Sequence, residues 1–154
     1  MPRESSGRAA TIVLFACVHN AGRSQMAAVW FNALADPARA RAVSAGTSPG
    51  PQVHPEVVSV MREVGFDLTG APTTRLTSEL ASDASVLVTM GCGDECPNVP
   101  GLKRIDWGLP DPGGQSLAVV RAIRDEIRGR VEDLLRTEGW SRRRESDPES
   151  PSPR

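Results

Sequence analysis

Short continuous apolar runs alternate along the chain with apolar residues at helical spacing, and this alternation predicts strands and helices in turn. The apolar runs predict strands at 11–16, 41–45, 85–90 and, more briefly, 103–106. Helical stripes follow the first run as far as Asp36-Pro37 and the second run as far as Gly65. The longest helix is expected over 115–137, where one face is apolar and the other is charged. This order is typical of an α/β fold with a parallel sheet and crossover helices.

Length and composition fit one globular domain. The chain has 154 residues, of which 39% are hydrophobic, and this is enough for a single core. The two ends, 1–10 and 140–154, are polar and in part proline-rich, so we expect disordered segments on either side of a catalytic domain at 11–139. We expect a monomer.

Charge and cysteine content argue against nucleic-acid-binding, membrane-spanning and disulfide-stabilised classes of protein. The net charge of −1 gives no overall basic field for nucleic acid, and no apolar run approaches the roughly 20 residues of a membrane span. Three cysteines are an odd number, which excludes a complete set of structural disulfides and favours a reducing compartment. We therefore expect a cytoplasmic protein that binds neither nucleic acid nor membrane.

The strongest chemical signal is the loop after the first expected strand, where residues 17–24 read Cys-Val-His-Asn-Ala-Gly-Arg-Ser. A strand that ends in a short loop and opens a helix directs backbone N–H groups and the positive end of the helix dipole into one concavity, which suits a tetrahedral oxyanion. The same field favours the thiolate of Cys17, a predicted nucleophile at neutral pH. The planar guanidinium of Arg23 matches two oxygens of a phosphate or arsenate. The sequence thus predicts an oxyanion-binding cysteine site formed by Cys17 with Val18, His19, Asn20, Ala21, Gly22, Arg23 and Ser24.

Individual residues of this loop suggest distinct roles. Gly22 allows a turn where a Cβ would clash, Ser24 is placed to donate its hydroxyl to the thiolate, and Asn20 is placed to tie the loop together. We expect the side chain of His19 to face outward. The alternative for Cys17 is a small buried apolar residue at the end of a strand, but arginine, serine and glycine at these offsets favour the catalytic interpretation.

A glycine-rich segment after the third expected strand carries Cys92 and Cys96, four residues apart. One helical turn or a closed loop brings such a pair within disulfide range. Three interpretations stay open: two buried structural thiols, a zinc site that also uses His19, His54 and Cys17, or a redox pair that resolves chemistry begun at Cys17. Glycine and acidic neighbours indicate exposure, and zinc would occupy Cys17, so we favour the redox pair.

The segment 106–114 supplies candidate acids. When a thiolate displaces an oxygen from a tetrahedral oxyanion, an acid that protonates the departing oxygen lowers the barrier. Asp111, in proline- and glycine-rich surroundings, is our candidate, although an aspartate before proline also suits a plain turn. Asp106 is a weaker candidate because it ends an expected strand. His54, next to a proline, is interpreted as a helix-start residue.

The residues 17–27, ending in Ser24-Gln-Met-Ala27, resemble the signature loop of the low-molecular-weight protein tyrosine phosphatase superfamily and, within it, the arsenate reductase branch. Thr89-Met-Gly-Cys92, Cys96-Pro97 and 106–112 strengthen this resemblance, which spans about 11–137. It implies a four-stranded parallel sheet flanked by helices, an active site at the first strand-to-helix loop, and reduction of arsenate to arsenite in arsenical detoxification.

The chain departs from the family pattern at two places. Gly113 stands where phosphatase relatives place an aromatic residue after Asp-Pro, and the chain has no tyrosine, which argues against phosphotyrosine recognition. Some thioredoxin-linked relatives use a glutamate on the first helix to bind potassium, but Ala27-Ala-Val stands here. We therefore expect no metal.

The resemblance also implies a mechanism. Cys17 attacks arsenic(V) while Arg23 and the loop amides hold the oxygens and Asp111 protonates the departing hydroxyl. Cys92 then attacks the Cys17 sulfur to release arsenite, and Cys96 moves the disulfide to a Cys92–Cys96 pair that thioredoxin reduces. No bound cofactor is expected.

Three alternative functions remain open from the sequence. The first is a phosphatase that uses Cys17, Arg23 and Asp111. The second is an arsenate–mycothiol or arsenate–glutathione transferase, recycled by mycoredoxin or glutaredoxin. An oxyanion sensor is the weakest alternative, because binding alone needs no activated thiol.

Overall fold

The computed structural model describes residues 10–91 and 101–142 and contains one parallel sheet. Its strand order is β2-β1-β3-β4, and every neighbouring pair is parallel. The strands are β1 (Thr11–Cys17), β2 (Ala40–Gly46), β3 (Val86–Thr89) and β4 (Lys103–Asp106). The four-stranded parallel sheet predicted from the sequence is confirmed, and the strand bounds differ from the predicted ones by one residue at most.

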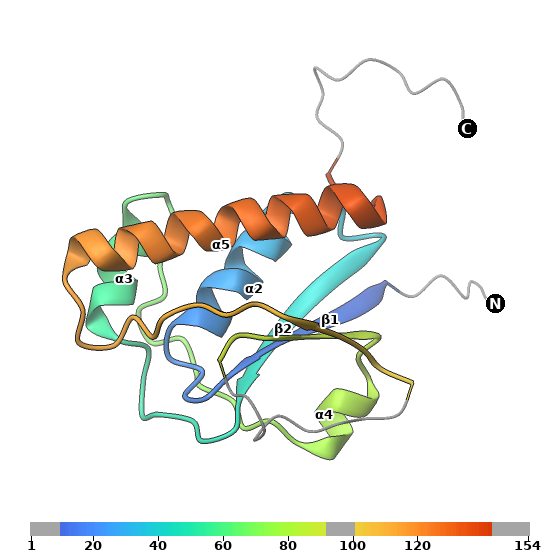
Figure 1. Cartoon of the computed structure of the whole chain (residues 1–154), viewed down its shortest axis with the longest axis horizontal. Helices are drawn as coiled ribbons and strands as arrows, with labels where there is room; N and C mark the ends of the chain where they lie inside the picture. The colour runs from blue at the N-terminus through green and yellow to red at the C-terminus, as the bar shows by residue number, and fades with distance from the viewer. Residues whose placement is uncertain (1–9, 92–100, 143–154) are drawn as a thin grey trace, which may run out of the picture.

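Helices cover both faces of this sheet (Figure 1). The helices are α2 (Arg23–Leu34), α3 (Pro55–Arg62), α4 (Ser78–Ser82) and α5 (Leu117–Glu138). Figure 1 shows α5 crossing above α2 and α3 on one side, whereas α4 lies on the other. The sequence did not predict α4, because five residues are too few for a periodic apolar stripe. None of the helices in the described ranges is long and apolar enough to cross a membrane.

The alternation of side chains along β1 determines which way the site faces. Val13, Phe15 and Cys17 join the core under α2 and α5, whereas Leu14 and Ala16 join the smaller core next to α4. All five side chains are buried, as expected for a central strand covered on both faces. The Cys17 side chain therefore points toward the face that carries α2.

The chain continues to contact α2 beyond the end of α5. Gly139 adopts a left-handed conformation (φ 77°) that ends α5, and the Trp140 ring then packs against Phe31 with 6.1 Å between centroids. The N–H of Arg142 donates to the carbonyl of Leu34 at 2.8 Å. These contacts extend three residues past the predicted domain end at 139, while 1–9 and 143–154, where tails were expected, lie outside the described residues.

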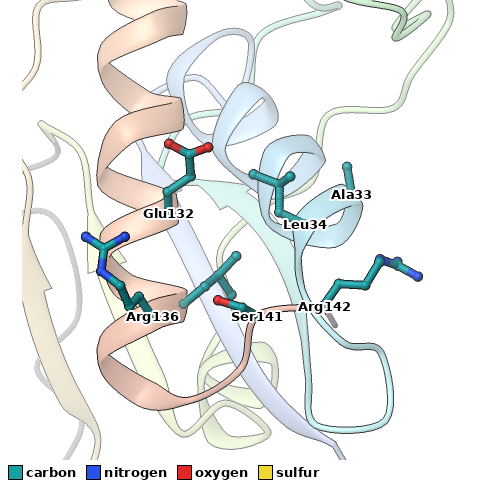
Figure 2. A pocket seen from close by; sticks show the side chains of 7 residues that line it. Ala33, Leu34, Glu132, Arg136, Ser141 and Arg142 are labelled. Carbon is teal, nitrogen blue, oxygen red and sulfur yellow. The ribbon is translucent and has the colours of Figure 1, made fainter. Parts of the chain in front are cut away.

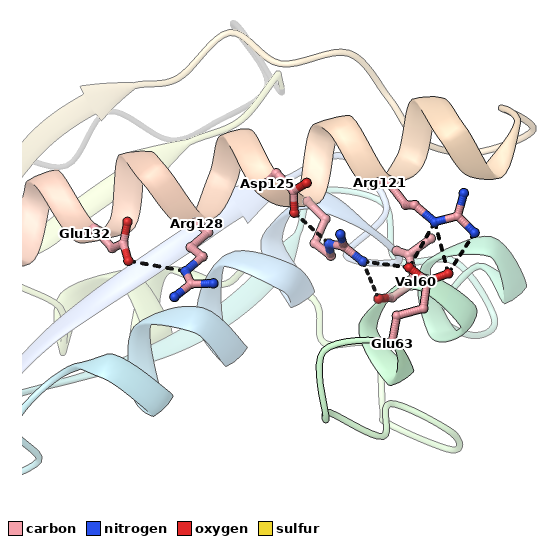
Figure 3. A network of polar contacts seen from close by, with 7 residues as sticks. Val60, Glu63, Arg121, Asp125, Arg128 and Glu132 are labelled. Atoms are coloured by element: carbon pink, nitrogen blue, oxygen red, sulfur yellow. Dashed lines mark hydrogen bonds and ion pairs between the residues drawn. The ribbon is translucent and has the colours of Figure 1, made fainter.

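An ionic network joins the C-terminal end of α3 to α5 (Figure 3). Both carboxylate oxygens of Glu63 accept hydrogen bonds from Arg121 at 2.8 to 3.0 Å. Arg124, which is only 8% exposed, donates to Glu63 and to the carbonyl of Val60, each at 2.9 Å. It also donates to Asp125 at 2.8 Å. The network fixes α3 against the longest helix.

This network predicts an acid-dependent loss of stability. Hydrogen bonding, chiefly from Arg121, lowers the pKa of Glu63 from 4.5 to about 2. A carboxyl whose pKa is lower in the folded state stabilises the fold above its unfolded-state pKa, and this contribution disappears as the pH falls through the folded-state value. We expect Glu63→Gln to have a lower free energy of unfolding than the unmodified protein at neutral pH. The gap should close between pH 4.5 and about 2.

Urea unfolding over a pH series measures this gap. Glu126→Gln is the matched control, because Glu126 pairs with Arg130 on an exposed part of the same helix and should contribute little at any pH. A Glu63→Gln deficit that stays constant down to pH 2 would show that the ion pairs are not its cause.

Candidate active site

Cys17 is the last residue of β1, and its sulfur lies next to the first turn of α2. The side chain is 2% exposed, and Sγ is 2.9 Å from Oγ of Ser24. The amide nitrogen of Asn20 donates to the same Ser24 oxygen at 2.8 Å. Because an amide nitrogen only donates, the Ser24 hydroxyl is the acceptor there and keeps its own hydrogen for the sulfur. The Ser24 hydroxyl thus lies within hydrogen-bond distance of the nucleophile candidate.

The loop between Cys17 and Arg23 is held from outside by its carbonyl groups. All six carbonyls of residues 17–22 accept hydrogen bonds, at 2.7 to 3.1 Å, from donors elsewhere in the fold. In chain order, these donors are the backbone N–H groups of Thr47, Ser48 and Gly50, the side chain of Gln25, and the N–H groups of His54 and Met26.

Turning the carbonyls outward turns the amides inward. In a trans peptide the N–H points opposite to the preceding C=O, and the described part of the chain has no cis peptide bond. The N–H groups of 18–23 therefore face away from the surrounding scaffold, and no acceptor for them occurs among residues 10–91 and 101–142. The loop is a concave set of unused donors at the start of α2, which is a geometry suited to an oxyanion.

Asn20 and Gln25 brace this loop from within the fold. Asn20 has a left-handed backbone (φ 51°), and its side-chain oxygen accepts from the N–H of Thr74 at 2.8 Å. The buried amide of Gln25 donates to the Asn20 carbonyl at 3.1 Å and to that of Pro72 at 2.8 Å. Sequence reasoning placed Gln25 in the signature motif but gave it no role; the signal was an amide directly after a predicted anion loop.

Gly46, at the end of β2, is a second residue that sequence reasoning missed. A Cβ at this position would lie 2.6 Å from the carbonyl oxygen of Val18 and 2.7 Å from the N atom of Asn20. Both neighbours are backbone atoms of the oxyanion loop, so glycine is required for the close approach of β2 to the loop.

Arg23 is the first residue of α2, and its side chain is 6% exposed. One terminal nitrogen, Nη1, donates to the carbonyl of Leu109 at 3.0 Å. Gly91 (φ 109°) lies against the same nitrogen, since a Cβ there would be 2.2 Å from it. Nε is buried without a hydrogen-bond partner in the described ranges. A buried, permanently charged donor without an acceptor is costly unless an anion completes it.

The segment that contains Asp111 lies against the oxyanion loop. Pro112 is buried, and a Cβ on Gly22 would be 2.5 Å from its Cγ, so the two segments are in close contact. Asp111 itself is exposed, and its Oδ1 accepts the N–H of Gly113 at 2.9 Å. The structure thus brings the candidate acid to the edge of the site.

Asp106, the competing candidate acid, is held as a carboxylate. The Thr89 hydroxyl and Arg104 Nε both donate to its Oδ1, the latter at 3.0 Å. These bonds, chiefly the one from Thr89, lower the pKa of Asp106. A carboxyl that two donors hold in its ionised form is a poor proton donor, so Asp106 remains the weaker candidate.

Comparison with known protein families agrees with this geometry. The family profile described as "Low molecular weight phosphotyrosine protein phosphatase" matches residues 12–144. The chain belongs to this family.

Two curated proteins that are similar to this chain in sequence have names that refer to arsenate. A "Putative arsenate reductase" of Halobacterium salinarum is 39% identical over 129 residues, which cover 79% of this chain and 88% of the relative. A "Glutaredoxin arsenate reductase" of Synechocystis sp. is 36% identical over 126 residues, covering 80% of this chain and 95% of the relative.

Solved structures of the family share the fold. A thioredoxin-dependent arsenate reductase of Corynebacterium glutamicum superposes with a TM-score of 0.73 at 34% identity and covers 86% of this chain. The present chain spans 64% of the length of that structure. An arsenate reductase of Archaeoglobus fulgidus gives a TM-score of 0.69 at 30% identity, over 80% of this chain and 98% of that one.

In the described part of the chain, the Cys17 sulfur is hydrogen-bonded to Ser24 and to neither of the two nearby histidines. His19 is exposed, and its Nδ1 donates to the carbonyl of Ser48 at 3.1 Å. His54 precedes α3 as its N-cap residue, in line with the helix-start interpretation. Both line a cavity of about 500 Å³ beside the loop, together with Ala21 and the turn at 48–52.

Cys92 and Cys96 lie outside the described residues, so their predicted redox role stays a prediction. Gly91, the residue before them, is described and contacts Arg23.

A second cavity, of about 600 Å³, is remote from this chemistry (Figure 2). It lies between the C-terminal ends of α2 and α5, whereas Arg23 begins α2 at the opposite end. Its lining residues, which include no thiol, are Ala33, Leu34, Glu132, Leu135, Arg136, Ser141 and Arg142. We do not include it in the active site.

Proposed function

We propose that this chain reduces arsenate to arsenite, with Cys17 as the nucleophile. The observation that carries the proposal is a buried sulfur hydrogen-bonded to Ser24 at the mouth of a loop whose inward amides, like Nε of Arg23, have no acceptor in the described ranges. The names of the relatives support arsenate as the oxyanion.

The first step is displacement at arsenic. Arsenate binds with its oxygens on the loop amides and Arg23, which places arsenic next to the Cys17 sulfur. A bond forms between sulfur and arsenic(V) as one As–OH bond breaks, and the departing hydroxyl leaves as water after it takes a proton from Asp111. General-acid assistance of this kind contributes about 10² to 10⁴ in rate.

The second step transfers two electrons. The Cys92 thiolate attacks the Cys17 sulfur, and the S–As electron pair passes to arsenic, which leaves as arsenite(III). A Cys17–Cys92 disulfide remains. Cys96 then attacks Cys92, releases Cys17 as a thiolate, and leaves a Cys92–Cys96 disulfide for an external reductant.

The proposed reductant is thioredoxin, in a reducing compartment such as the cytoplasm. A pair of internal cysteines suits a dithiol relay, and the Corynebacterium glutamicum structure is named thioredoxin-dependent. The Synechocystis relative is named for glutaredoxin, so a small thiol such as glutathione or mycothiol is the competing donor. A small thiol would attack the arsenic adduct directly and make Cys92 and Cys96 dispensable.

Cys96→Ser separates these routes. With arsenate, thioredoxin, thioredoxin reductase and NADPH, the relay predicts a single turnover that ends in a trapped Cys17–Cys92 disulfide, identified by peptide mass spectrometry. Sustained NADPH oxidation by this variant would contradict the relay. The double variant Cys92→Ser/Cys96→Ser is the control, and its full activity with a small thiol and the matching oxidoreductase would select the transferase route.

A phosphatase is the second candidate, because its family profile spans the site and Cys17, Arg23 and Asp111 suit phosphate ester hydrolysis as well. Gly113 weakens this candidate, since it offers no aromatic wall for an aryl group. Rapid hydrolysis of p-nitrophenyl phosphate, without arsenate-dependent NADPH oxidation, would select the phosphatase.

A further inference from the structure

The turn after Asp111 is tied to the start of α3 by a long-range hydrogen bond. Glu56, the second residue of α3, accepts the N–H of Gly114 on Oε2 at 3.1 Å. Asp111 accepts the preceding N–H, that of Gly113, at 2.9 Å. Two carboxylates from distant parts of the chain therefore hold two successive amides of one turn.

Close packing confirms how tightly this turn is seated. A Cβ on Gly113 would lie 3.0 Å from Nε2 of His54 and 3.4 Å from Oδ1 of Asp111. Gly114 has a φ of 75°, which a residue with a Cβ adopts at a cost. The turn therefore packs against the ring of His54 at Gly113, and the carboxyl of Asp111 lies at the same contact.

The start of α3 also contacts the oxyanion loop. The N–H of His54 donates to the carbonyl of Ala21 at 2.9 Å, and a Cβ on Gly22 would lie 3.5 Å from the His54 ring. At its other end α3 is fixed to α5 through Glu63. The start of α3 therefore contacts both the oxyanion loop and the turn that follows Asp111.

We propose that Glu56 is a positioning residue, which holds Asp111 at the oxyanion loop through the amide of Gly114. The proposal rests on the function proposed above, in which Asp111 is the acid. The competing explanation for Glu56 is general: an acidic residue in the first turn of a helix stabilises the helix dipole without any effect on catalysis.

Arsenate turnover by five variants, one of them Asp111→Asn alone, separates the two explanations. Glu56→Ala removes the acceptor, and misplacement of a catalytic group by about 1 Å is expected to lower kcat by up to about 10²-fold with little change in KM. Glu56→Gln keeps an oxygen acceptor for Gly114 and should retain most of the activity. In an Asp111→Asn background, Glu56→Ala should cause no further loss. Glu79→Ala is the control, since Glu79 is an exposed acid in the first turn of α4, and its kcat should be unchanged.

Each result decides between these explanations. An unchanged kcat in Glu56→Ala overturns the positioning role. So does an equal loss of kcat when Glu56→Ala is made in the unmodified protein and in the Asp111→Asn background. If Asp111→Asn lowers kcat and Glu56→Ala does not, the positioning role fails but the proposed function stands. An unchanged kcat in Asp111→Asn overturns the acid assignment and the positioning role together. Thermal unfolding of each variant tests whether a loss of kcat comes from unfolding.

Discussion

Replacing Cys17 by serine is expected to abolish arsenate reduction and to leave oxyanion binding intact. A serine hydroxyl at neutral pH is neither ionised nor able to form the disulfide that carries electrons to arsenic. The inward amides of 18–23 and the guanidinium of Arg23 are unaffected by the exchange, because the loop is held by its carbonyls and not by the sulfur.

Two measurements on Cys17→Ser test this pair of expectations. The thioredoxin-coupled assay should show no arsenate-dependent NADPH oxidation, and calorimetric titration with arsenate should show binding close to that of the unmodified protein. Turnover above background would contradict the role of the thiol. Loss of binding would mean that the sulfur, and not the amide loop, holds the anion.

The second large effect is expected at Arg23. Arg23→Lys keeps the positive charge but removes the planar set of guanidinium N–H donors, including Nε, which has no partner in the described ranges. Loss of one such donor to a reacting oxyanion lowers kcat by about 10²- to 10³-fold. Gly91→Ala should lower the activity by a related route, since its Cβ would lie 2.2 Å from Nη1 and displace the guanidinium.

A surface arginine provides the matched control for Arg23. Arg39 also donates to a backbone carbonyl, that of Gly139 at 2.9 Å, but its side chain is 63% exposed. Steady-state kinetics of Arg39→Lys should match those of the unmodified protein. If Arg23→Lys also kept full kcat/KM, a positive charge alone would be enough for catalysis, and the guanidinium N–H donors would have no catalytic role of their own.

Much of the fold was predictable because its central strands are continuous apolar runs. β1 and β3 are buried along most of their length, so their composition alone marks them as interior strands of a parallel sheet. The helix α4 was not predicted, since its five residues depend on a cap from Thr77 and on packing of Ala81 against the sheet. Such short elements follow from tertiary contacts more than from local pattern.

The oxyanion loop was predictable because strand, loop and helix are contiguous in sequence. The residues that brace it are not: Gly46, Gln25 and Thr74 act through contacts that only the folded chain creates. Glu56 is the clearest case, because its partner Gly114 is 58 residues away. Nothing in the local sequence distinguishes it from any acidic residue in a first helical turn.

The most direct test of the account uses a protein with Cys17 as its only thiol, made by Cys92→Ser/Cys96→Ser. Its alkylation by iodoacetamide is followed with and without phosphate, an unreduced analogue of arsenate. If the amides and Arg23 hold the anion against the sulfur, phosphate will slow alkylation in a saturable manner, and Arg23→Lys will weaken that protection. An alkylation rate that phosphate leaves unchanged at every concentration would contradict the central claim.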